Sequence, residues 1–345
     1  MAHTSSFGTL PDGSPVTAFE LSAGDPALRL TVLDLGGTVA RLRVPDAAGR
    51  LVDVALGLAT AGDYAAASNP YLGATVGRYA NRIADARFTL EGTEHRLTAN
   101  EGSTCLHGGV DGFSARRWSV LDAGTDALEL SLVSPAGDQG FPGELRAVVR
   151  YEVTGDSVTI THRATTHATT VVSLTNHTYF NLAGTGTVDD HLLEVSAEEY
   201  LPVDAHSIPT GVREPVQDTP FDFREAARIG SRVSSPHPQV RQAGGVDHAL
   251  LLRSTGLRAA ARLEHPASGR VLEVSTDQPS LQVYTGHKLD GTVADRDGVL
   301  LRPRAGIALE CQAYPDAPNQ PTFPSAVLRP GEEYHATTVW RFGTT

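Results

Sequence analysis

Two residues carry side chains suited to moving protons near neutral pH. His177 lies in the segment NHTYFNL (176–182), directly after the apolar stretch 171–174. Imidazole has an unperturbed pKa of about 6.5, so it can donate or accept a proton with little tuning. Glu310 lies within the apolar pattern IALECQ (307–312), where burial would raise the carboxyl pKa toward that of a useful base. The two side chains together offer general acid–base chemistry.

Five further residues stand in short motifs rich in hydrogen-bonding groups. Adjacent glycines in the first motif allow a tight turn and close approach of the backbone to a ligand. Amide, guanidinium and carboxylate groups in the others can hold hydroxyl groups in fixed directions. These residues are His107 in LHGG (106–109), Asn81 and Arg82 in GRYANRI (77–83), Asp247 in GGVDH (244–248) and Gln282 in LQVYTG (281–286).

Each of these residues also has a purely structural interpretation. His177 could be a core histidine that bonds a backbone carbonyl, and Glu310 could be paired with one of the many arginines. His107 and Asp247 could occupy ordinary turns, the GRYANRI segment could be an ion-paired loop, and Gln282 could face solvent on a strand. Taken singly, no motif decides between the structural and the functional role.

The elements that must position these residues are predicted to be strands. Short segments rich in Val, Leu, Thr and aromatic residues are separated by Gly, Asp, Asn and Pro, which is typical of many strands joined by turns. Gly155-Asp156 favours a type II′ hairpin, because glycine suits the first position of that turn. Helical periodicity is confined to brief stretches such as 223–229. The clearest strand segments are 28–35, 128–133, 148–153, 157–162 and 271–274.

The chain shows neither a linker nor a fixed-period repeat, so residues 1–345 are predicted to form a single domain. A strand-rich chain must cover the faces of its sheets by packing sheet on sheet. The predicted fold class is therefore all-β, a large antiparallel β-sandwich with few short helices. Its loops and concave face can carry a site, but the fold alone does not specify a reaction.

Composition limits the classes of partner and the location. The chain has 345 residues, of which 40% are hydrophobic and 20% charged, as in an ordinary globular protein. A net charge of -12 argues against sequence-independent nucleic-acid binding, which needs basic clusters, and Lys288 is the only lysine. Cys105 and Cys311 stand far apart, which favours buried free thiols over a disulfide or thiolate zinc site. A signal-peptide pattern and a membrane-length apolar run are both lacking, so a cytoplasmic location is expected.

Taken together, the motifs resemble those of the aldose 1-epimerase (galactose mutarotase) family. The matches occur in one order along residues 77–334. Such a series would not assemble from unrelated core histidines and turn aspartates. The matching motifs are GRYANRI, LHGG followed by GF and Trp118, NHTYFNLAG, VDH, LQVYTG, LECQAYPDAPNQPTFPS and LRPGEEY.

The resemblance implies an activity and a role for each residue. The family fold is a large β-sandwich, the galactose mutarotase-like supersandwich, with its site in an open groove. The implied reaction is interconversion of the α and β anomers of free hexoses such as D-galactose and D-glucose, as part of hexose metabolism. It needs no metal or organic cofactor, and a monomer or homodimer is expected. His177 matches the general acid and Glu310 the general base, and the sugar-binding positions match Asn81, Arg82, His107, Asp247 and Gln282, with Tyr179 bordering the same pocket.

The sequence departs from the family pattern at two positions. Ala249 follows Asp247-His248 where a bulky residue is usual, and His287 stands where TGN is usual. Both departures bear on which sugar is preferred.

Three other functions are compatible with these motifs. A carbohydrate-binding module would keep the hydroxyl binders but would not need the acid–base pair. A glycosidase could use Asp247 and Glu310 as its two carboxylates, which would leave His177 without a role. A relative acting on hexose 6-phosphates would need an arginine cluster to grip the phosphate.

Overall fold

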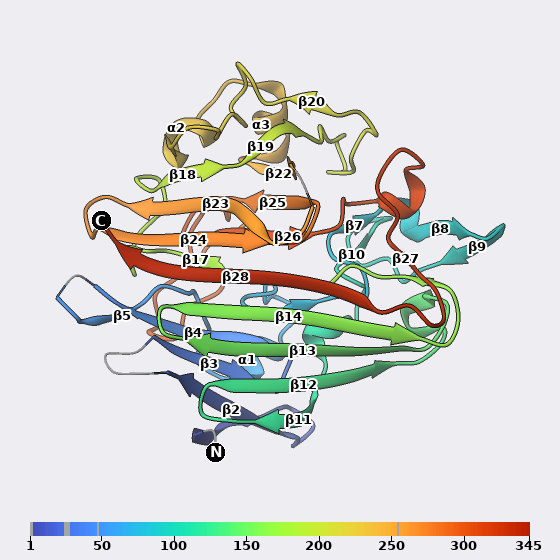
Figure 1. Cartoon of the computed structure of the whole chain (residues 1–345), viewed down its shortest axis with the longest axis horizontal. Coiled ribbons are helices and arrows are strands. Elements are labelled where there is room, and N and C mark those ends of the chain that lie inside the picture. The colour runs from blue at the N-terminus through green and yellow to red at the C-terminus, as the bar shows by residue number, and fades with distance from the viewer. Residues whose placement is uncertain (1–2, 24–27, 47, 254) are drawn as a thin grey trace.

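A nine-stranded antiparallel sheet forms one layer of the molecule, and its strands cross the front of Figure 1. The computed structural model describes residues 3–23, 28–46, 48–253 and 255–345. The strands follow the order β11-β12-β13-β14-β28-β24-β23-β18-β21. Their bounds are β11 Ser119–Ala123, β12 Ala127–Ser134, β13 Leu145–Thr154, β14 Ser157–Thr166, β28 Tyr334–Thr344, β24 Arg270–Thr276, β23 Arg258–His265, β18 Leu192–Val195 and β21 Ala227–Arg228.

Two smaller antiparallel sheets form the second layer. An isolated bridge between Ala55 and Phe180 connects the two sheets where the chain leaves β5. The five-stranded sheet comprises β1 His3–Thr9, β2 Pro15–Ser22, β3 Arg29–Leu33, β4 Thr38–Pro45 and β5 Leu51–Asp53. The six-stranded sheet runs in the order β17 Tyr179–Phe180, β26 Ile307–Gln312, β25 Ser280–Tyr284, β22 Asp247–Leu252, β19 Ala197–Tyr200 and β20 Glu214–Pro215.

Short strand pairs and helices lie outside these three sheets. The paired strands are β7 Arg82–Ile83 with β10 Cys105–Leu106, β6 Thr75–Val76 with β16 Thr175–Asn176, β15 Thr170–Val171 with β27 Val327–Leu328, and β8 Arg87–Leu90 with β9 Thr93–Arg96. The α-helices are α1 Ala61–Ala65, α2 Ile229–Val233 and α3 Pro238–Ala243. The 3₁₀ turns are Ala84–Ala86, Phe113–Ala115, Asp138–Gly140 and Ala317–Asn319.

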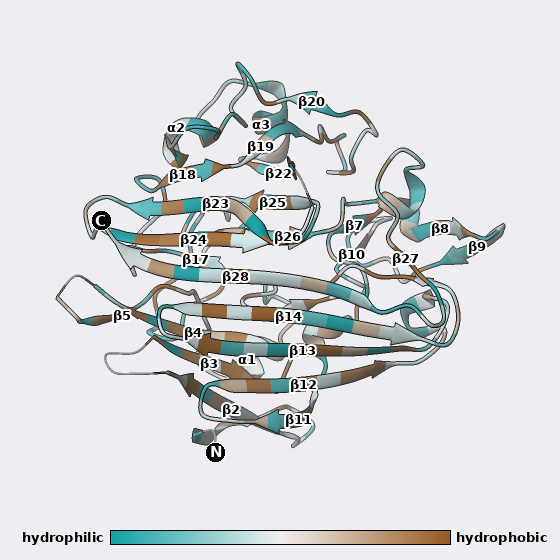
Figure 2. Cartoon of the chain, viewed as in Figure 1, coloured by the Kyte–Doolittle hydropathy of each residue, from teal (hydrophilic) through white to brown (hydrophobic). Residues whose placement is uncertain are grey.

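The main core lies between the layers and follows from alternation along the strands. In β13 every second residue from Leu145 to Val153 is buried, and Figure 2 shows polar and apolar residues alternating along this part of the sheet. These side chains belong to the same hydrophobic cluster as Leu30 of β3 and Leu281 of β25. The predicted all-β sandwich is therefore confirmed.

The hairpin between β13 and β14 has the predicted two-residue loop. Thr154 pairs directly with Ser157, and Gly155 has a φ of 58°, as the first position of a type II′ turn requires. Cys105 and Cys311 are both buried and free, as the sequence indicated.

The prediction of a helical segment over 223–229 is wrong. Ala227 and Arg228 form β21, which pairs with Leu193 and Leu192 of β18, and the helix begins only at Ile229. Backbone pairing with an existing sheet edge outweighs a weak helical periodicity, because local propensity contributes only tenths of a kcal/mol per residue (about 0–0.7).

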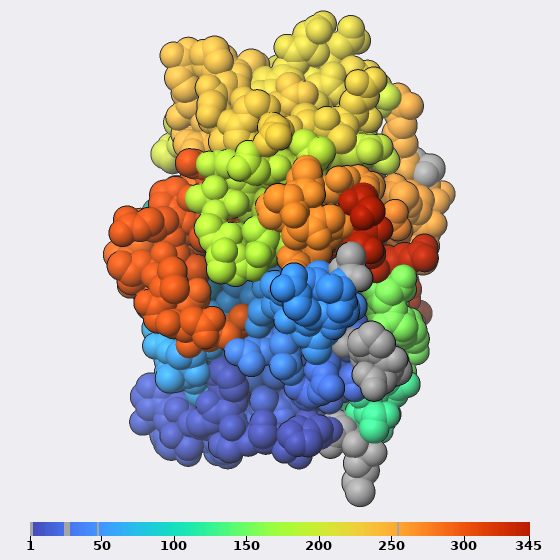
Figure 3. Space-filling model, turned by 90° about the vertical axis from the view of Figure 1, so that its left-hand side faces the viewer, coloured from blue at the N-terminus to red at the C-terminus, as the bar shows by residue number. Residues whose placement is uncertain are grey.

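Segments far apart in the sequence lie side by side in the tertiary structure. The Arg296 guanidinium bonds the Asp53 carboxylate at 2.5 Å, and the Arg296 N–H donates to the Gly57 carbonyl at 2.9 Å. Figure 3 shows the corresponding contact between the orange segment near residue 300 and the blue N-terminal third. Within the described part of the chain, no helix is long and apolar enough to cross a membrane.

Candidate active site

Three adjacent strands of the six-stranded sheet align polar side chains on one face. Gln282 of β25 stands opposite Glu310 of β26, and Asp247 of β22 stands opposite Tyr284 of β25. Alternate residues such as Leu309 belong to the main core, so these polar side chains point away from the nine-stranded sheet. The Gln282 Nε2 group donates to Asp247 Oδ1 at 2.7 Å, which fixes the carboxylate.

A loop carries His107 to the same face. β7 pairs with β10 so that Arg82 stands opposite Leu106, the residue before His107. The His107 N–H donates to the Asn81 carbonyl at 3.0 Å, and the Asn81 N–H donates to His107 Nδ1 at 3.1 Å. Because Nδ1 accepts a hydrogen bond, the neutral ring carries its proton on Nε2. His107 is therefore oriented as a hydrogen-bond donor.

The close approach of this loop requires glycine. Gly108 has a φ of +89°, and a Cβ atom there would lie 2.0 Å from the Gly77 carbonyl oxygen. The backbone of the LHGG motif thus lies directly against the backbone at Gly77, and this contact positions His107.

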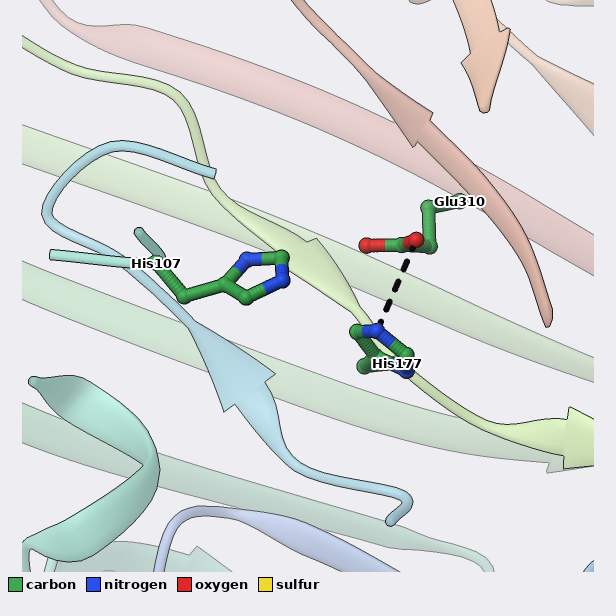
Figure 4. Close-up of side chains that lie close together, drawn as sticks. All are labelled: His107, His177 and Glu310. Atoms are coloured by element: carbon green, nitrogen blue, oxygen red, sulfur yellow. Dashed lines mark ion pairs between the residues drawn. The ribbon is translucent and has the colours of Figure 1, made fainter. Parts of the chain in front are cut away.

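His177 lies in the link between β16 and β17 and faces Glu310. Backbone hydrogen bonds fix the link on both sides, since the His177 N–H donates to Ala74 at 2.8 Å and the Gly73 N–H donates to the His177 carbonyl at 3.0 Å. His177 Nε2 and Glu310 Oε1 are 3.6 Å apart (Figure 4). The His107 ring lies edge-on to the His177 ring, with centroids 5.2 Å apart.

Arg82 connects this face to the mouth of the pocket. Its Nε and Nη2 groups donate to Glu101 at 2.6 and 3.0 Å, and its Nη1 lies 3.9 Å from Asp247 Oδ2. Lys288 Nζ lies 3.4 Å from the same Glu101 carboxylate. The Tyr71 ring stands 4.6 Å from the His107 ring.

A pocket of about 120 Å³ brings together most of the predicted site residues. Gln282 does not line this pocket and instead holds Asp247 from behind. Tyr179 lines it, but its hydroxyl donates to the Pro70 carbonyl at 3.0 Å, so its ring is what it presents to His177. The predicted residues on the wall are Asn81, Arg82, His107, His177, Tyr179, Asp247 and Glu310, and the wall residues that the sequence did not single out are Pro70, Tyr71, Glu101, Leu106, Tyr284 and Lys288.

Only part of this second group left a signal in the sequence. Tyr284 and Leu106 lie inside motifs that were already recognised, and Lys288 was notable as the only lysine. Tyr71 and Glu101 lie outside those motifs. Their roles depend on ring stacking and ion pairing across the pocket, which no local pattern encodes.

Burial shifts the protonation of the acid–base pair. Burial, reinforced by the negative charge of Asp247, raises the pKa of Glu310 well above its ordinary value, although Arg82 opposes the shift. Burial lowers the pKa of His177 to about 4. Asp247 differs, because Arg82, His287 and Gln282 outweigh its burial and hold its pKa below the usual value. Burial therefore favours the uncharged forms of Glu310 and His177, whereas Asp247 is held as the carboxylate.

Several buried polar atoms on this face form no hydrogen bond within the protein. Among the described wall residues, Glu310 Oε2 and His177 Nδ1 have no hydrogen-bond partner, and Gln282 Oε1, behind the wall, has none either. An unpaired buried polar atom costs about 1–3 kcal/mol, so such a cluster favours a polar ligand that supplies the missing bonds.

By distance alone, His107, His177 and Glu310 could hold a metal ion, since their ligand atoms lie within 4.8 Å of one another. The hydrogen bond from the Asn81 N–H to His107 Nδ1 argues against this function. A metal ion needs the lone pair of His107 Nε2, which carries the proton in this tautomer. The cluster suits proton transfer better than metal coordination.

A larger depression of about 730 Å³ lies elsewhere, along residues 218–222 and 231–237. Two of its polar groups are occupied by neighbours, since Arg224 binds the Asp222 carboxylate and the Gln239 N–H donates to His237 Nδ1. The smaller pocket is the candidate active site because unpaired acid–base groups converge there.

The fold and the pocket together define a class of protein, a β-sandwich whose site combines a buried carboxyl–imidazole pair with groups that bind hydroxyls. Comparison with known proteins makes the class specific, because the aldose 1-epimerase family model matches residues 19–341. The chain belongs to the aldose 1-epimerase family. The family and the isomerase class predicted from the motifs are thereby confirmed.

The similarity to individual relatives extends over nearly the whole chain. The galactose mutarotase of Sus scrofa is 44% identical over 342 residues, which cover 97% of each chain. The aldose 1-epimerase of Escherichia coli (strain K12) is 39% identical over 338 residues, which cover 96% of each chain. The crystal structure of an aldose epimerase homologue from C. elegans has a TM-score of 0.88 at 31% identity and covers 95% of this chain and 99% of that chain.

Proposed function

We propose that this chain is a mutarotase that interconverts the α and β anomers of free hexoses such as D-galactose and D-glucose. The observation that carries the proposal is the placement of His177 Nε2 3.6 Å from Glu310 Oε1 on the pocket wall, beside groups that can hold hydroxyls. The relatives named galactose mutarotase and aldose 1-epimerase support the same reaction.

Mutarotation requires a proton to leave the anomeric hydroxyl O1 and another to reach the ring oxygen O5. Glu310 accepts the O1 proton, while His177 donates a proton to O5 from Nε2. The C1–O5 bond breaks and O1 becomes the aldehyde oxygen. After rotation about the C1–C2 bond, the reverse transfers close the ring as the other anomer and restore both groups. Each positioned proton transfer contributes a factor of about 10² to 10⁴.

Glu310 must be the carboxylate and His177 must carry the proton when Glu310 acts as the base. In the free protein, burial favours the protonated carboxyl of Glu310 and the neutral imidazole of His177, because it raises the pKa of Glu310 and lowers that of His177. A sugar hydroxyl that donates to the unpaired Glu310 Oε2 favours the carboxylate and so shifts the proton to His177. The net charge of the pair is the same in both states.

The remaining predicted residues orient the sugar. His107 Nε2–H and the Arg82 guanidinium are donors, and the Asp247 carboxylate is an acceptor whose position is fixed by Gln282. The Asn81 side-chain oxygen accepts from the Arg82 N–H, so its amide group is left for the ligand. Such restraint of the sugar favours the reactive geometry.

The geometry favours the mutarotase over its rivals. In a glycosidase, Asp247 would serve with Glu310, but Asp247 is already bound by Gln282 and lies near Arg82. In an enzyme for hexose 6-phosphates, several arginines would face the pocket, whereas Arg82 is the only arginine among the described wall residues. A pure binding module would not require the carboxyl–imidazole pair.

Several accompanying predictions remain part of the proposal. They are a single domain over 1–345, a cytoplasmic location, action without a metal or organic cofactor, a monomeric or homodimeric state, and a sugar as the partner rather than nucleic acid or membrane.

Polarimetry of freshly dissolved α-D-galactose and α-D-glucose tests the proposal. The native chain should speed the decay of rotation, and Glu310→Gln and His177→Asn should each lower the rate by about 10² to 10⁴. Glu225→Gln and His206→Asn alter the same residue types at exposed positions and should retain the native rate. No acceleration of any free sugar, or full activity in Glu310→Gln, would contradict the proposal.

A further inference from the structure

Three charged side chains form a continuous chain from the pocket floor to its mouth. We call Arg82, Glu101 and Lys288 the charged rim. The Arg82 side chain is 6% exposed, Glu101 is 35% exposed and Lys288 is 52% exposed, so the rim runs from the interior to solvent. Glu101 lies at its centre and bonds both cations, at 2.6 Å to Arg82 Nε and 3.4 Å to Lys288 Nζ.

The backbone holds both ends of the rim in place. The Glu101 and Thr104 N–H groups donate to each other's carbonyls at 3.2 and 3.0 Å. On the other side of the pocket, the Lys288 N–H donates to the Tyr284 hydroxyl at 3.1 Å. The rim therefore joins two loops that are 187 residues apart in sequence.

Two cations and two carboxylates face one another on the pocket wall. Arg82 and Lys288 are the Arg and Lys residues among the described wall residues, and Glu101 and Asp247 are the carboxylates that face them. Arg82, with help from Lys288, outweighs the burial of Glu101 and holds the pKa of Glu101 below its usual value. Glu101 is therefore ionised at neutral pH, and it engages Arg82 through both of its oxygens.

We propose that Glu101 is a specificity-determining residue that excludes anionic sugars by occupying the only two Arg and Lys cations on the described pocket wall. This inference rests on the proposed mutarotase function and concerns the same site. A carboxylate or phosphate on the sugar would have to displace Glu101 from a two-bond pair with Arg82, and it would then face the negative charge of Glu101 itself. A neutral hexose needs only single hydrogen bonds and leaves the rim intact.

Removal of the Glu101 charge should convert the rim into an anion site. Glu101→Gln has nearly the same shape but frees the Lys288 ammonium and most of the Arg82 guanidinium. The two freed cations could then bind a carboxylate at the mouth of the pocket. Lys288 is the only lysine in the chain, so its contribution can be removed by one substitution.

D-Galactose and D-galacturonate form a matched pair of probes, because they differ only in the charged group at C6. We would measure kcat/KM for anomer exchange with both sugars in the native chain and in Glu101→Gln, Glu101→Asp and the double variant Glu101→Gln/Lys288→Met. The ratio of galacturonate to galactose should rise about tenfold in Glu101→Gln, equivalent to about 1.4 kcal/mol. The ratio should stay low in Glu101→Asp, which keeps the charge, and should fall back in the double variant.

Two results would overturn the role of Glu101. One is a native chain that uses both sugars equally well, and the other is a Glu101→Gln variant in which both rates fall by the same factor, because Glu101 would then only order Arg82. A native chain that accelerates neither sugar refutes the mutarotase function instead. In that case, titration calorimetry with the same two sugars still tests whether Glu101→Gln raises the relative affinity for galacturonate.

Discussion

At the scale of single residues, burial shifts the pKa values of Glu310 and His177 in opposite directions. Burial raises the pKa of the carboxyl group and lowers that of the imidazole, and the two groups lie 3.6 Å apart. A fully exposed pair would instead sit as carboxylate and, near neutral pH, mostly neutral imidazole. The identity of each group is fixed by the sequence, while its working protonation state is fixed by its surroundings.

The opposed pKa shifts of the two groups predict the pH dependence of catalysis. Below the pKa of His177, which is about 4, both groups are protonated, so Glu310 can no longer act as the base. At high pH the last proton leaves the pair and no acid remains. We expect kcat/KM to be level near neutral pH and to fall about tenfold per pH unit below about 4 and again on the alkaline side.

Polarimetric rates across the pH range, together with near-UV circular dichroism at each pH, check this prediction. A rate that falls between pH 7 and 6 while the protein stays folded would contradict it, because His177 would then titrate at its ordinary pKa.

At the scale of elements, two different structural features place polar side chains on the pocket face of the six-stranded sheet. Strand register places Gln282 opposite Glu310, whereas the β7–β10 pair and the LHGG turn deliver His107 from a segment about 200 residues away in sequence. Positioning by strand register tolerates substitutions that keep the alternation of side chains along the strand. Positioning by the LHGG turn depends on one backbone contact, between Gly108 and Gly77.

Gly108→Ala should therefore damage both the fold and the site. The new Cβ would meet the Gly77 carbonyl oxygen at 2.0 Å in a backbone conformation of φ +89° that alanine rarely adopts. We expect a loss of more than about 1 kcal/mol in the free energy of unfolding, measured with urea, and a clear fall in kcat because His107 is displaced.

Gly92→Ala is the matched control, since Gly92 has a φ of +82° but a Cβ there would have no neighbour within 4 Å. It should cost only about 1 kcal/mol of stability and leave kcat unchanged. Equal losses of activity in the two variants would show that the contact with Gly77 does not position the site.

At the scale of the whole molecule, the large core buries several histidines in their neutral form. Burial lowers the pKa of His162, His177 and His248 to about 4 and that of His191 to about 3. These histidines would have pKa values near 6.5 in the unfolded chain. Between pH 6.5 and 4 these four histidines therefore bind more protons in the unfolded chain than in the folded protein, and their contribution to stability falls as the pH falls.

We accordingly expect the protein to be acid-labile, with a lower Tm at pH 5 than at pH 7. Each such histidine contributes a slope of up to about 1.4 kcal/mol per pH unit within its window. Thermal melts of the native chain and of His162→Leu provide the test, because His162 lies on β14 and does not line the pocket. The slope should be shallower in the variant, and identical slopes would contradict the assignment of His162.

The sequence by itself determined the local chemistry and the class of fold. Alternating strands, the Gly155-Asp156 turn and the ordered motifs predicted a sandwich and the residues now found on or directly behind one pocket wall. These features are encoded locally, because side-chain alternation and turn conformation depend on neighbouring residues.

Only the tertiary structure decided how the groups interact. It showed that Gln282 supports Asp247, that the Tyr179 hydroxyl bonds Pro70, and that Glu101 joins Arg82 to Lys288. It also replaced the helical segment predicted over 223–229 with a sheet edge. Contacts between residues tens to hundreds of positions apart, and the desolvation that sets each pKa, arise only when the layers pack, so no local pattern could encode them.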